Sequence, residues 1–192
     1  MSFCHMYNSP PAILDALVLD MNKDKPFKIQ ASTIPYILQG KCSLLFIIYY
    51  YVWLIVVSTH VLGRNIIAQA QAGAGKTLAF TIGMLARIDS TKDKLQAICL
   101  TPTRELAVQI MSDAITPLKA RITPPVKGEV ILAGVNIARN SKSSAHVIVG
   151  TPGKVVECLS KKYLSLKHVN VFVLDEADFM VADTERGILS TI

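Results

Sequence analysis

The sequence is poor in cysteine and has no closely spaced cysteine pair. Its 192 residues contain four, Cys4, Cys42, Cys99 and Cys158. These positions are too far apart for a Cys-x-x-Cys pair, so the spacing gives neither a disulfide framework nor a zinc-binding pattern. A reducing compartment therefore fits the sequence best.

A secretory signal is also missing from the N-terminal stretch MSFCHMYNSPPAIL. The stretch lacks a basic region followed by an apolar region, so we expect no signal peptide. Apolar residues are abundant, at 51% of the whole chain. This content can bury a substantial core and argues against disorder, and the length suits one domain or slightly more.

Asp, Glu, Lys and Arg are absent from residues 42–63, CSLLFIIYYYVWLIVVSTHVLG, which lie between Lys41 and Arg64. The length would permit a membrane helix, since ~20 apolar residues cross a hydrocarbon core. However, the continuously apolar part, residues 44–57, is shorter and dense in Ile, Val, Tyr and Trp, which favour strands as much as helices. The rest of the chain must decide between these alternatives.

The net charge of +6 is unevenly distributed. Residues 119–168 contain nine of the twenty Lys and Arg residues but only two of the fourteen Asp and Glu residues. A basic surface of this kind would suit a polyanion such as a nucleic acid. Charge alone is equally compatible with a solvated basic face that has no partner.

From Arg64 onward, short strand-like runs alternate with helical stretches. The apolar runs are NIIAQA, LQAICLT, EVILAG, AHVIVGT and VNVFVLD, and helical character is clearest in KTLAFTIGMLARI and RELAVQIMSDAITPLKA. This alternation predicts an α/β fold in which βαβ units surround a buried parallel sheet. Ligands of such sheets bind at the carboxyl ends of the strands.

The segment AQAGAGKT, residues 70–77, follows one of these strands directly and precedes a helical run. Its glycines permit a tight turn whose N–H groups face phosphate, while a lysine can reach the β and γ phosphates and a threonine can bind magnesium. A plain Gly-rich turn is the alternative, because Ala70 replaces the first glycine of the usual pattern. The predicted nucleotide-binding residues here are Ala72, Gly73, Ala74, Gly75, Lys76 and Thr77.

The segment VFVLDEAD, residues 171–178, places three acidic residues at the end of an apolar strand. Three carboxylates so close together repel one another unless they share a cation, and Asp175 is suitably placed to hold the magnesium of ATP. Glu176 could orient or deprotonate the attacking water. An acidic helix N-cap would explain one of these residues but not all three.

Together, AQAGAGKT and DEAD at 175–178 resemble the motifs of the DEAD-box ATP-dependent RNA helicases. PTRELA, residues 102–107, and TPGK, residues 151–154, resemble the two family motifs that contact the RNA backbone. Hydroxyl and cationic side chains, with N–H groups at helix starts, are natural phosphate donors that grip RNA without reading its sequence. The RNA-binding residues implied are Pro102, Thr103, Arg104, Glu105, Thr151, Pro152, Gly153 and Lys154.

The resemblance extends upstream and identifies further residues. PFKIQ, residues 26–30, resembles the adenine-recognising Q motif, in which Gln30 would hydrogen-bond the base, and Asp178 is implied in coupling between domains. Two positions depart from the family pattern. Lys23 stands where an aromatic residue usually stacks on adenine, and Ala133 replaces one glycine of a Gly-Gly pair.

The resemblance implies a RecA-like domain over residues 26–192, preceded by an N-terminal extension, residues 1–25. The sequence stops before the Ser-Ala-Thr motif and contains no second RecA-like domain with its arginine finger. We therefore expect the N-terminal half of a helicase that uses ATP and Mg²⁺ and binds RNA. A catalytically incomplete ATP- and RNA-binding fragment is the non-enzymatic alternative, and a P-loop kinase or GTPase-like switch is the competing enzyme.

Within the family, QAICLTPTRELA and HVIVGTPGKV are most similar to the mRNA-export helicase of the nuclear pore. The translation-initiation helicase is the alternative. The export subfamily implies nuclear-pore proteins as partners and a location in cytoplasm and nucleus.

Residues 41–63 interrupt this domain as an apolar insertion. One membrane span would carry the chain to the opposite face of the bilayer, so we expect no membrane insertion. The five predicted strands and their helices leave no evident place for a buried insert. Gly40-Lys41-Cys42 can be encoded by GGT-AAG-TGT, which contains a splice-donor sequence, and Leu62-Gly63 by TTA-GGN, which contains an acceptor. We therefore predict a translated, unspliced intron, with a lineage-specific insert and a membrane anchor as alternatives.

Overall fold

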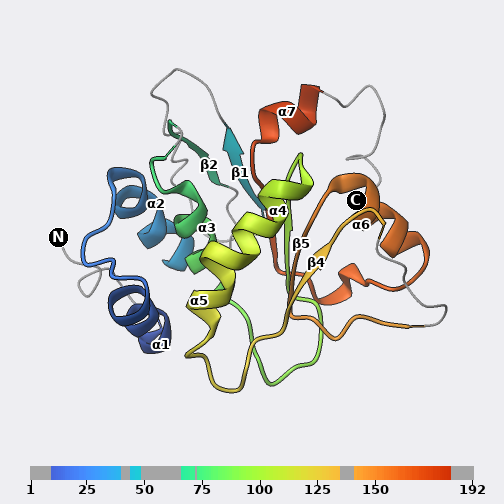
Figure 1. Cartoon of the computed structure of the whole chain (residues 1–192), viewed down its shortest axis with the longest axis horizontal. Coiled ribbons are helices and arrows are strands. Elements are labelled where there is room, and N and C mark those ends of the chain that lie inside the picture. Colours follow the sequence, from blue (N-terminus) through green and yellow to red (C-terminus); the bar gives the residue numbers. More distant parts are fainter. Residues whose placement is uncertain (1–9, 40–43, 49–65, 72, 135–140, 183–192) are drawn as a thin grey trace.

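A six-stranded parallel sheet forms the centre of the computed structural model, which describes residues 10–39, 44–48, 66–71, 73–134 and 141–182. The strand order is β2-β1-β6-β3-β5-β4, and every neighbouring pair is parallel (Figure 1). The strands are β1 (Leu44–Ile48), β2 (Ile66–Gln69), β3 (Ala97–Leu100), β4 (Gly128–Ile131), β5 (Val147–Gly150) and β6 (Val171–Leu174). The predicted α/β class with a parallel sheet is thus confirmed.

The central strands are uncharged and buried. All four residues of β3 and all four of β5 are buried, as expected for a parallel sheet that is covered on both faces. The register pairs Leu100 of β3 with Gly150 of β5 and with Leu174 of β6. The residues that follow these three strands therefore leave the sheet at the same edge.

Helices connect the strands. The described helical segments are α1 (Pro11–Asp15), η2 (Ala16–Asp20), α2 (Lys28–Gln39), α3 (Lys76–Leu85), α4 (Arg104–Ile110), η3 (Met111–Ile115), α5 (Thr116–Lys119), α6 (Pro152–Ser160), η4 (Leu166–His168) and α7 (Ala177–Ala182). The backbone stays helical from α4 through the π-helical turn η3 into α5. The two helical stretches expected after the glycine-rich loop and after PTRE are both present.

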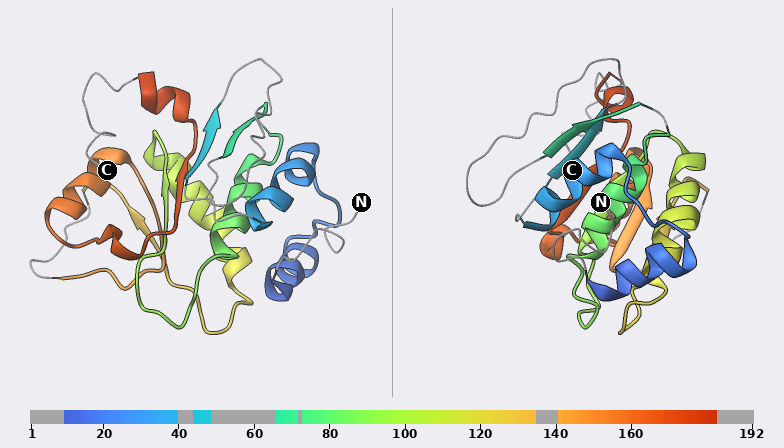
Figure 2. Two further views of the ribbon diagram at one scale, coloured as in Figure 1. Left: turned by 180° about the vertical axis from the view of Figure 1, so that it is seen from behind. Right: turned by 90° about the vertical axis from the view of Figure 1, so that its left-hand side faces the viewer.

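Two apolar layers enclose the sheet. Ala97 and Cys99 of β3 pack in a core with residues of α1 to α5, whereas Ile98 and Leu100 face the opposite core, to which α6 and α7 contribute. This alternation follows from the period of two along a strand. Figure 2 shows the helices on both sides of the sheet from two further directions.

Strand β1 comes from the apolar insertion and corrects one of our expectations. Residues 44–48 lie between β2 and β6 and pair with both, so the insertion does have a place in the sheet. The physical reason lies in their sequence, LLFII, because an uncharged run of strand-favouring residues suits a position inside a parallel sheet. The remainder of the insertion, residues 41–43 and 49–63, lies outside the described residues.

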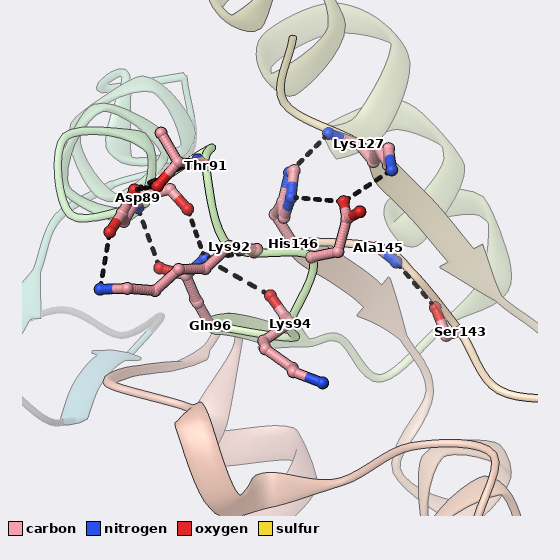
Figure 3. Close-up of polar contacts among 10 residues, drawn as sticks. Asp89, Thr91, Lys92, Lys94, Gln96, Lys127, Ser143, Ala145 and His146 are labelled. Atoms are coloured by element: carbon pink, nitrogen blue, oxygen red, sulfur yellow. Dashed lines mark hydrogen bonds and ion pairs between the residues drawn. The ribbon is translucent and has the colours of Figure 1, made fainter. Parts of the chain in front are cut away.

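The amino edge of the sheet is held together by a polar cluster (Figure 3). Gln96, just before β3, accepts a hydrogen bond from the Asp89 N–H at 2.9 Å and donates one to the Asp89 carbonyl at 2.8 Å. His146, just before β5, accepts one from the Lys127 N–H at 3.0 Å, and burial lowers the pKa of its imidazole. Asp93 forms an ion pair with Lys127 at 2.7 Å. These contacts join turns at the edge opposite the sequence motifs.

Among the helices in the described ranges, none combines the length and the apolar character that crossing a bilayer requires.

Candidate functional site

The four motifs after β2, β3, β5 and β6 gather at the carboxyl edge of the sheet. Because these strands are parallel, the chain leaves each of them in the same direction. The register places Thr101, Thr151 and Asp175 side by side immediately beyond paired strand ends. The glycine-rich loop is separated from the acidic motif by β1 alone. The fold thus brings together residues that are up to about a hundred positions apart in the sequence.

The glycine-rich loop owes its shape to two left-handed residues. Gly73 and Gly75 have φ values of +73° and +83°, which residues other than glycine rarely adopt. Gly75 is the N-cap residue of α3, so the loop leads directly into the first turn of the helix, where Lys76 and the half-buried Thr77 lie. Ala74 is half-buried in the same turn, and Ala72 lies outside the described residues.

Lys76 is largely buried, with 8% of its surface exposed. Its ammonium group donates hydrogen bonds to the carbonyl of Ala70 and, at 3.2 Å, to that of Gln71. Burial lowers the pKa of this amine, while the charges of Asp175, Glu176 and Asp178 act in the opposite direction. The amine therefore lies within the loop and in the electrostatic field of the acidic motif.

Asp175 is a buried carboxylate, with 6% of its surface exposed. Burial, reinforced by the neighbouring charge of Glu176, raises its pKa to about 6, although the Lys76 charge opposes this shift. A carboxylate that is costly to ionise in isolation is stabilised by a cation. Hard oxygen ligands are those that Mg²⁺ prefers, so Asp175 and the Thr77 hydroxyl are chemically suited to that ion.

The acidic motif turns sharply after Asp175. The Asp175 N–H still continues the sheet by donating to the Leu100 carbonyl at 2.9 Å, but Glu176 has a left-handed φ of +53°. A non-glycine residue in this conformation is strained, and such residues concentrate at functional sites. The turn leaves Glu176 and Asp178 half-buried at the start of α7.

Gln30 joins helix α2 to the glycine-rich loop. The residue is almost completely buried, with 2% of its surface exposed. The amide nitrogen donates to the Gly75 carbonyl at 3.0 Å, and the amide oxygen accepts from the Phe27 N–H at 2.9 Å. A residue 45 positions upstream of Gly75 is therefore in direct contact with the loop.

The PTRE segment presents polar side chains at the start of α4. Thr103, Arg104 and Glu105 are exposed, and Pro102 is half-buried. Thr103 is the N-cap, and its hydroxyl accepts the Leu106 N–H at 3.3 Å. The helix thus begins two residues after Pro102, so the N–H groups exposed at its start belong to the residues after Thr103.

The TPGK segment forms the first turn of α6. Thr151 is the N-cap, Pro152 is the first helical residue and Gly153 is exposed. The Lys154 side chain is only 10% exposed and forms an ion pair with Glu157 at 3.0 Å. Glu157 also binds Lys161, and these bonds, led by that to Lys161, lower the pKa of its carboxyl. Lys154 is therefore engaged with its own helix.

The two positions that depart from the family pattern are both at the surface. Lys23 is exposed and is fixed by its backbone N–H, which donates to the Leu17 carbonyl at 2.8 Å. Ala133 is exposed just before Gly134, whose φ is +89°. Sequence reasoning did not single out Phe27, which contacts the loop. An aromatic residue directly after Pro26 of the PFKIQ segment was the signal that could have identified it.

The family model for DEAD/DEAH box helicases matches residues 27–192. The chain belongs to this family. Relatives include the ATP-dependent RNA helicase FAL1 of Candida glabrata, 43% identical over 126 residues, which are 64% of this chain and 31% of that protein. The ATP-dependent RNA helicase ddx19 of Dictyostelium discoideum is 37% identical over 164 residues, which are 85% of this chain and 30% of that protein. This membership argues against the P-loop kinase and GTPase alternative.

The fold is shared with a solved family member. Dbp5 of S. cerevisiae, bound to RNA and ADP BeF3, superimposes with a TM-score of 0.77 and 29% identity over 99% of this chain and 41% of Dbp5. The RecA-like architecture expected from the sequence is thereby confirmed. The chain spans about a third of the length of the curated relatives it matches.

Proposed function

We propose that this domain is the N-terminal half of an ATP-dependent RNA helicase. It binds ATP with Mg²⁺ at the glycine-rich loop and holds the backbone of single-stranded RNA for local unwinding or RNP remodelling. One observation carries the proposal. A lysine in the first turn of a helix after a glycine-rich loop lies in the electrostatic field of three carboxylates that follow strand β6.

The chain's own residues divide the work at the phosphates. On binding, the Lys76 amine exchanges the carbonyls of Ala70 and Gln71 for phosphate oxygens, and the N–H groups at the start of α3 bind further oxygens. Thr77 and Asp175 would hold the magnesium ion, which would supply positive charge that stabilises the charged phosphates. Glu176 orients the attacking water and accepts its proton. Asp178 couples this site to the second domain.

Gln30 selects the base. Its amide donates a hydrogen bond to Gly75 of the loop, so the side chain that hydrogen-bonds adenine in this proposal is also in contact with the phosphate-binding loop. An amide offers both a donor and an acceptor, which complements the Hoogsteen edge of adenine and not that of guanine.

The RNA backbone lies across the starts of α4 and α6 in this proposal. Exposed Thr103, Arg104 and Glu105 line one helix start, and Thr151, Pro152 and Gly153 line the other. At the second start, the N–H groups contribute more than the Lys154 amine, which is bound to Glu157. These groups recognise phosphate and sugar, so binding is independent of sequence.

The mRNA-export branch is our proposal for the subfamily. A further Dbp5 structure contains Nup159, Gle1, IP6 and ADP, and helicases of the ddx19 type are among the relatives. This proposal implies nuclear-pore partners and a location in cytoplasm and nucleus. A translation-initiation helicase is the second candidate, since the Drosophila melanogaster initiation factor 4A is 42% identical over 123 residues. An ATP- and RNA-binding fragment without turnover is the non-enzymatic candidate.

Nucleotide binding tests the proposal. We expect magnesium-dependent binding of ATP in preference to GTP, measured by calorimetry with each nucleotide at equal concentration. Lys76→Ala should weaken ATP binding roughly 100-fold, because a charge-assisted hydrogen bond is worth up to ~3 kcal/mol. The matched control is Lys94→Ala, which removes an exposed lysine near the opposite edge and should leave the affinity unchanged. Equal affinities for ATP and GTP would contradict the role of Gln30.

RNA binding tests the second half of the proposal. We expect fluorescence anisotropy with labelled single-stranded RNA to give similar affinities for unrelated sequences and a steep loss of affinity with added salt, because backbone contacts release counterions. Arg104→Ala should weaken binding, whereas Arg121→Ala, which removes an arginine bound to Asp20, should not. A salt-independent affinity would argue against phosphate contacts.

A further inference from the structure

An exposed aromatic ring lies beside the glycine-rich loop. Phe27 precedes the first residue of α2, and 54% of its surface is exposed. A Cβ atom added to Gly75 would be 2.7 Å from the Phe27 Cδ2 atom, so the ring lies against the backbone of the loop. With 54% of its surface exposed, the ring lies at the loop without being covered by the core.

The backbone under the ring is held firmly. The Phe27 N–H donates to the Gln30 amide oxygen at 2.9 Å, and the Phe27 carbonyl accepts the Ala31 N–H at 2.9 Å. The same Gln30 amide donates to Gly75 at 3.0 Å. One side chain thus fixes the ring's backbone and the loop relative to each other, and the ring needs no rearrangement to stay at the loop.

Packing of the apolar core does not explain this position. Ile29 and Ile34, on the same helix, are 7% and 1% exposed and belong to the buried set, whereas Phe27 is not part of either core. An anchoring role would require the ring to be covered. The ring instead offers an aromatic surface next to Gly75, the N-cap residue of α3.

We propose that the Phe27 ring packs against the nucleoside of the nucleotide bound at the glycine-rich loop. This inference rests on the proposed function. The phosphates accept hydrogen bonds from the backbone N–H groups from Gly75 onward. The attached ribose and base must then extend away from the loop, past the residues that lie beside it. Lys23, at the position where an aromatic is usual, offers no ring. Phe27 is an aromatic group in contact with the loop that can supply this surface.

The contribution of the ring should be moderate. Stacking of a base on an aromatic side chain is typically worth a five- to hundredfold change in affinity when the side chain is truncated. We therefore expect Phe27→Ala to weaken ATP binding about tenfold. Phe27→Leu keeps apolar bulk but removes the aromatic face, so its affinity for ATP should lie between those of the unmodified chain and Phe27→Ala.

The decisive experiment compares ATP with inorganic tripolyphosphate, which has the phosphates but no nucleoside. Calorimetry in the presence of Mg²⁺ should show that Phe27→Ala weakens ATP binding and leaves tripolyphosphate binding unchanged. Tyr36→Ala is the matched control, because it removes another exposed aromatic side chain, 48% exposed, from the same helix. It should change neither affinity. Thermal melting of each variant checks that the fold is intact.

The outcomes separate this inference from the proposed function. Equal loss of ATP and tripolyphosphate binding in Phe27→Ala would show that the ring shapes the loop, and would overturn the inference. Unchanged ATP binding would overturn it as well. In both cases the proposed function stands if Lys76→Ala still weakens the binding of both ligands strongly. Failure of the unmodified chain to bind ATP with Mg²⁺ would overturn the proposed function, and the inference with it.

Discussion

At the scale of single residues, the site concentrates unfavourable local states. Asp175 is a buried carboxylate whose pKa is raised to about 6, and Glu176 has a left-handed backbone. Neither state is favourable for a chain that only has to fold. Both are consistent with a site that binds a cation and phosphates, because a nearby cation stabilises the ionised form of a buried carboxylate.

The ionisation of Asp175 gives a pH-dependent prediction. Its folded pKa of about 6 exceeds the usual value of 3.8, so the folded chain holds the proton more tightly and loses stability as pH rises from about 4 to 6. Asp175→Asn removes this loss. We expect the variant to be more stable than the unmodified chain at pH 8 by on the order of 2 kcal/mol, but not at pH 4. Urea unfolding at both values measures the difference.

Asp89→Asn is the control for this experiment. Hydrogen bonds, first from Lys92 and then from Thr91, lower the pKa of the exposed Asp89 carboxyl to about 2. A lowered pKa means that ionisation favours the folded state above the unfolded pKa, so this variant should gain no stability at pH 8. If Asp89→Asn gained as much stability at pH 8 as Asp175→Asn, the cause would be the change in net charge and not the burial of Asp175.

At the scale of elements, the close contact of α2 and α3 determines where Gln30 lies. A Cβ atom at Gly83 of α3 would overlap the Cγ2 methyl of Ile37 on α2. We expect Gly83→Ala to destabilise the chain by about 1–3 kcal/mol, since overpacking costs that much, and to weaken ATP binding by displacing α2. Chemical denaturation and calorimetry measure the two effects.

A double-mutant cycle tests the cause. Ile37→Ala removes the methyl group that Gly83→Ala would meet, so the double variant should be more stable than the sum of the single effects predicts, by about 1 kcal/mol or more. Gly153→Ala serves as the matched control, because nothing lies within 4 Å of an added Cβ there. Additive effects of the two substitutions would mean that the helices do not meet at this contact.

Strand β1 gives a prediction about the insertion. Within the described residues, β2 pairs with β1 and with no other strand. Deleting residues 41–63 therefore removes the strand that joins the glycine-rich loop to the rest of the sheet. We expect the chain without these 23 of its 192 residues to melt at a lower temperature and to bind ATP more weakly than the full chain. An unchanged melting temperature would show that β1 contributes nothing to the sheet.

The origin of the insertion is a separate question. We retain the proposal that residues 41–63 are encoded by an unspliced intron, since the reading frame survives its removal. Sequencing the mature transcript decides between the two origins. A mature transcript that keeps all 23 codons would contradict the intron proposal and show that the insert is genuine. A segment that first arose as intron sequence can still occupy a place in the sheet, so transcript and deletion experiments are independent.

At the scale of the whole molecule, the site forms only part of a catalytic centre in our proposal. An arginine finger is typically worth ~10³ to 10⁵ in the rate of phosphoryl transfer, and the resemblance places it on a second domain. We expect residues 1–192 alone to hydrolyse ATP barely above background, measured as phosphate release with and without RNA. RNA-stimulated turnover that Glu176→Gln abolishes would falsify this expectation.

The sequence by itself determined the fold class, five of the six strands and the positions of the motifs. These features are local, because an uncharged strand such as AICL, a glycine-rich turn and a helix start are each specified by a few adjacent residues. Parallel strands then carry their following residues to one edge of the sheet. The sequence alone therefore predicts that Lys76 and Asp175 belong to one site.

Only the tertiary structure decided which distant groups meet. It placed β1 between β2 and β6, tied Gln30 to Gly75 and left Phe27 exposed beside the loop. It also buried Asp175 deeply enough to raise its pKa. Pairing, burial and desolvation depend on neighbours supplied by other parts of the chain, and a local pattern does not specify those neighbours.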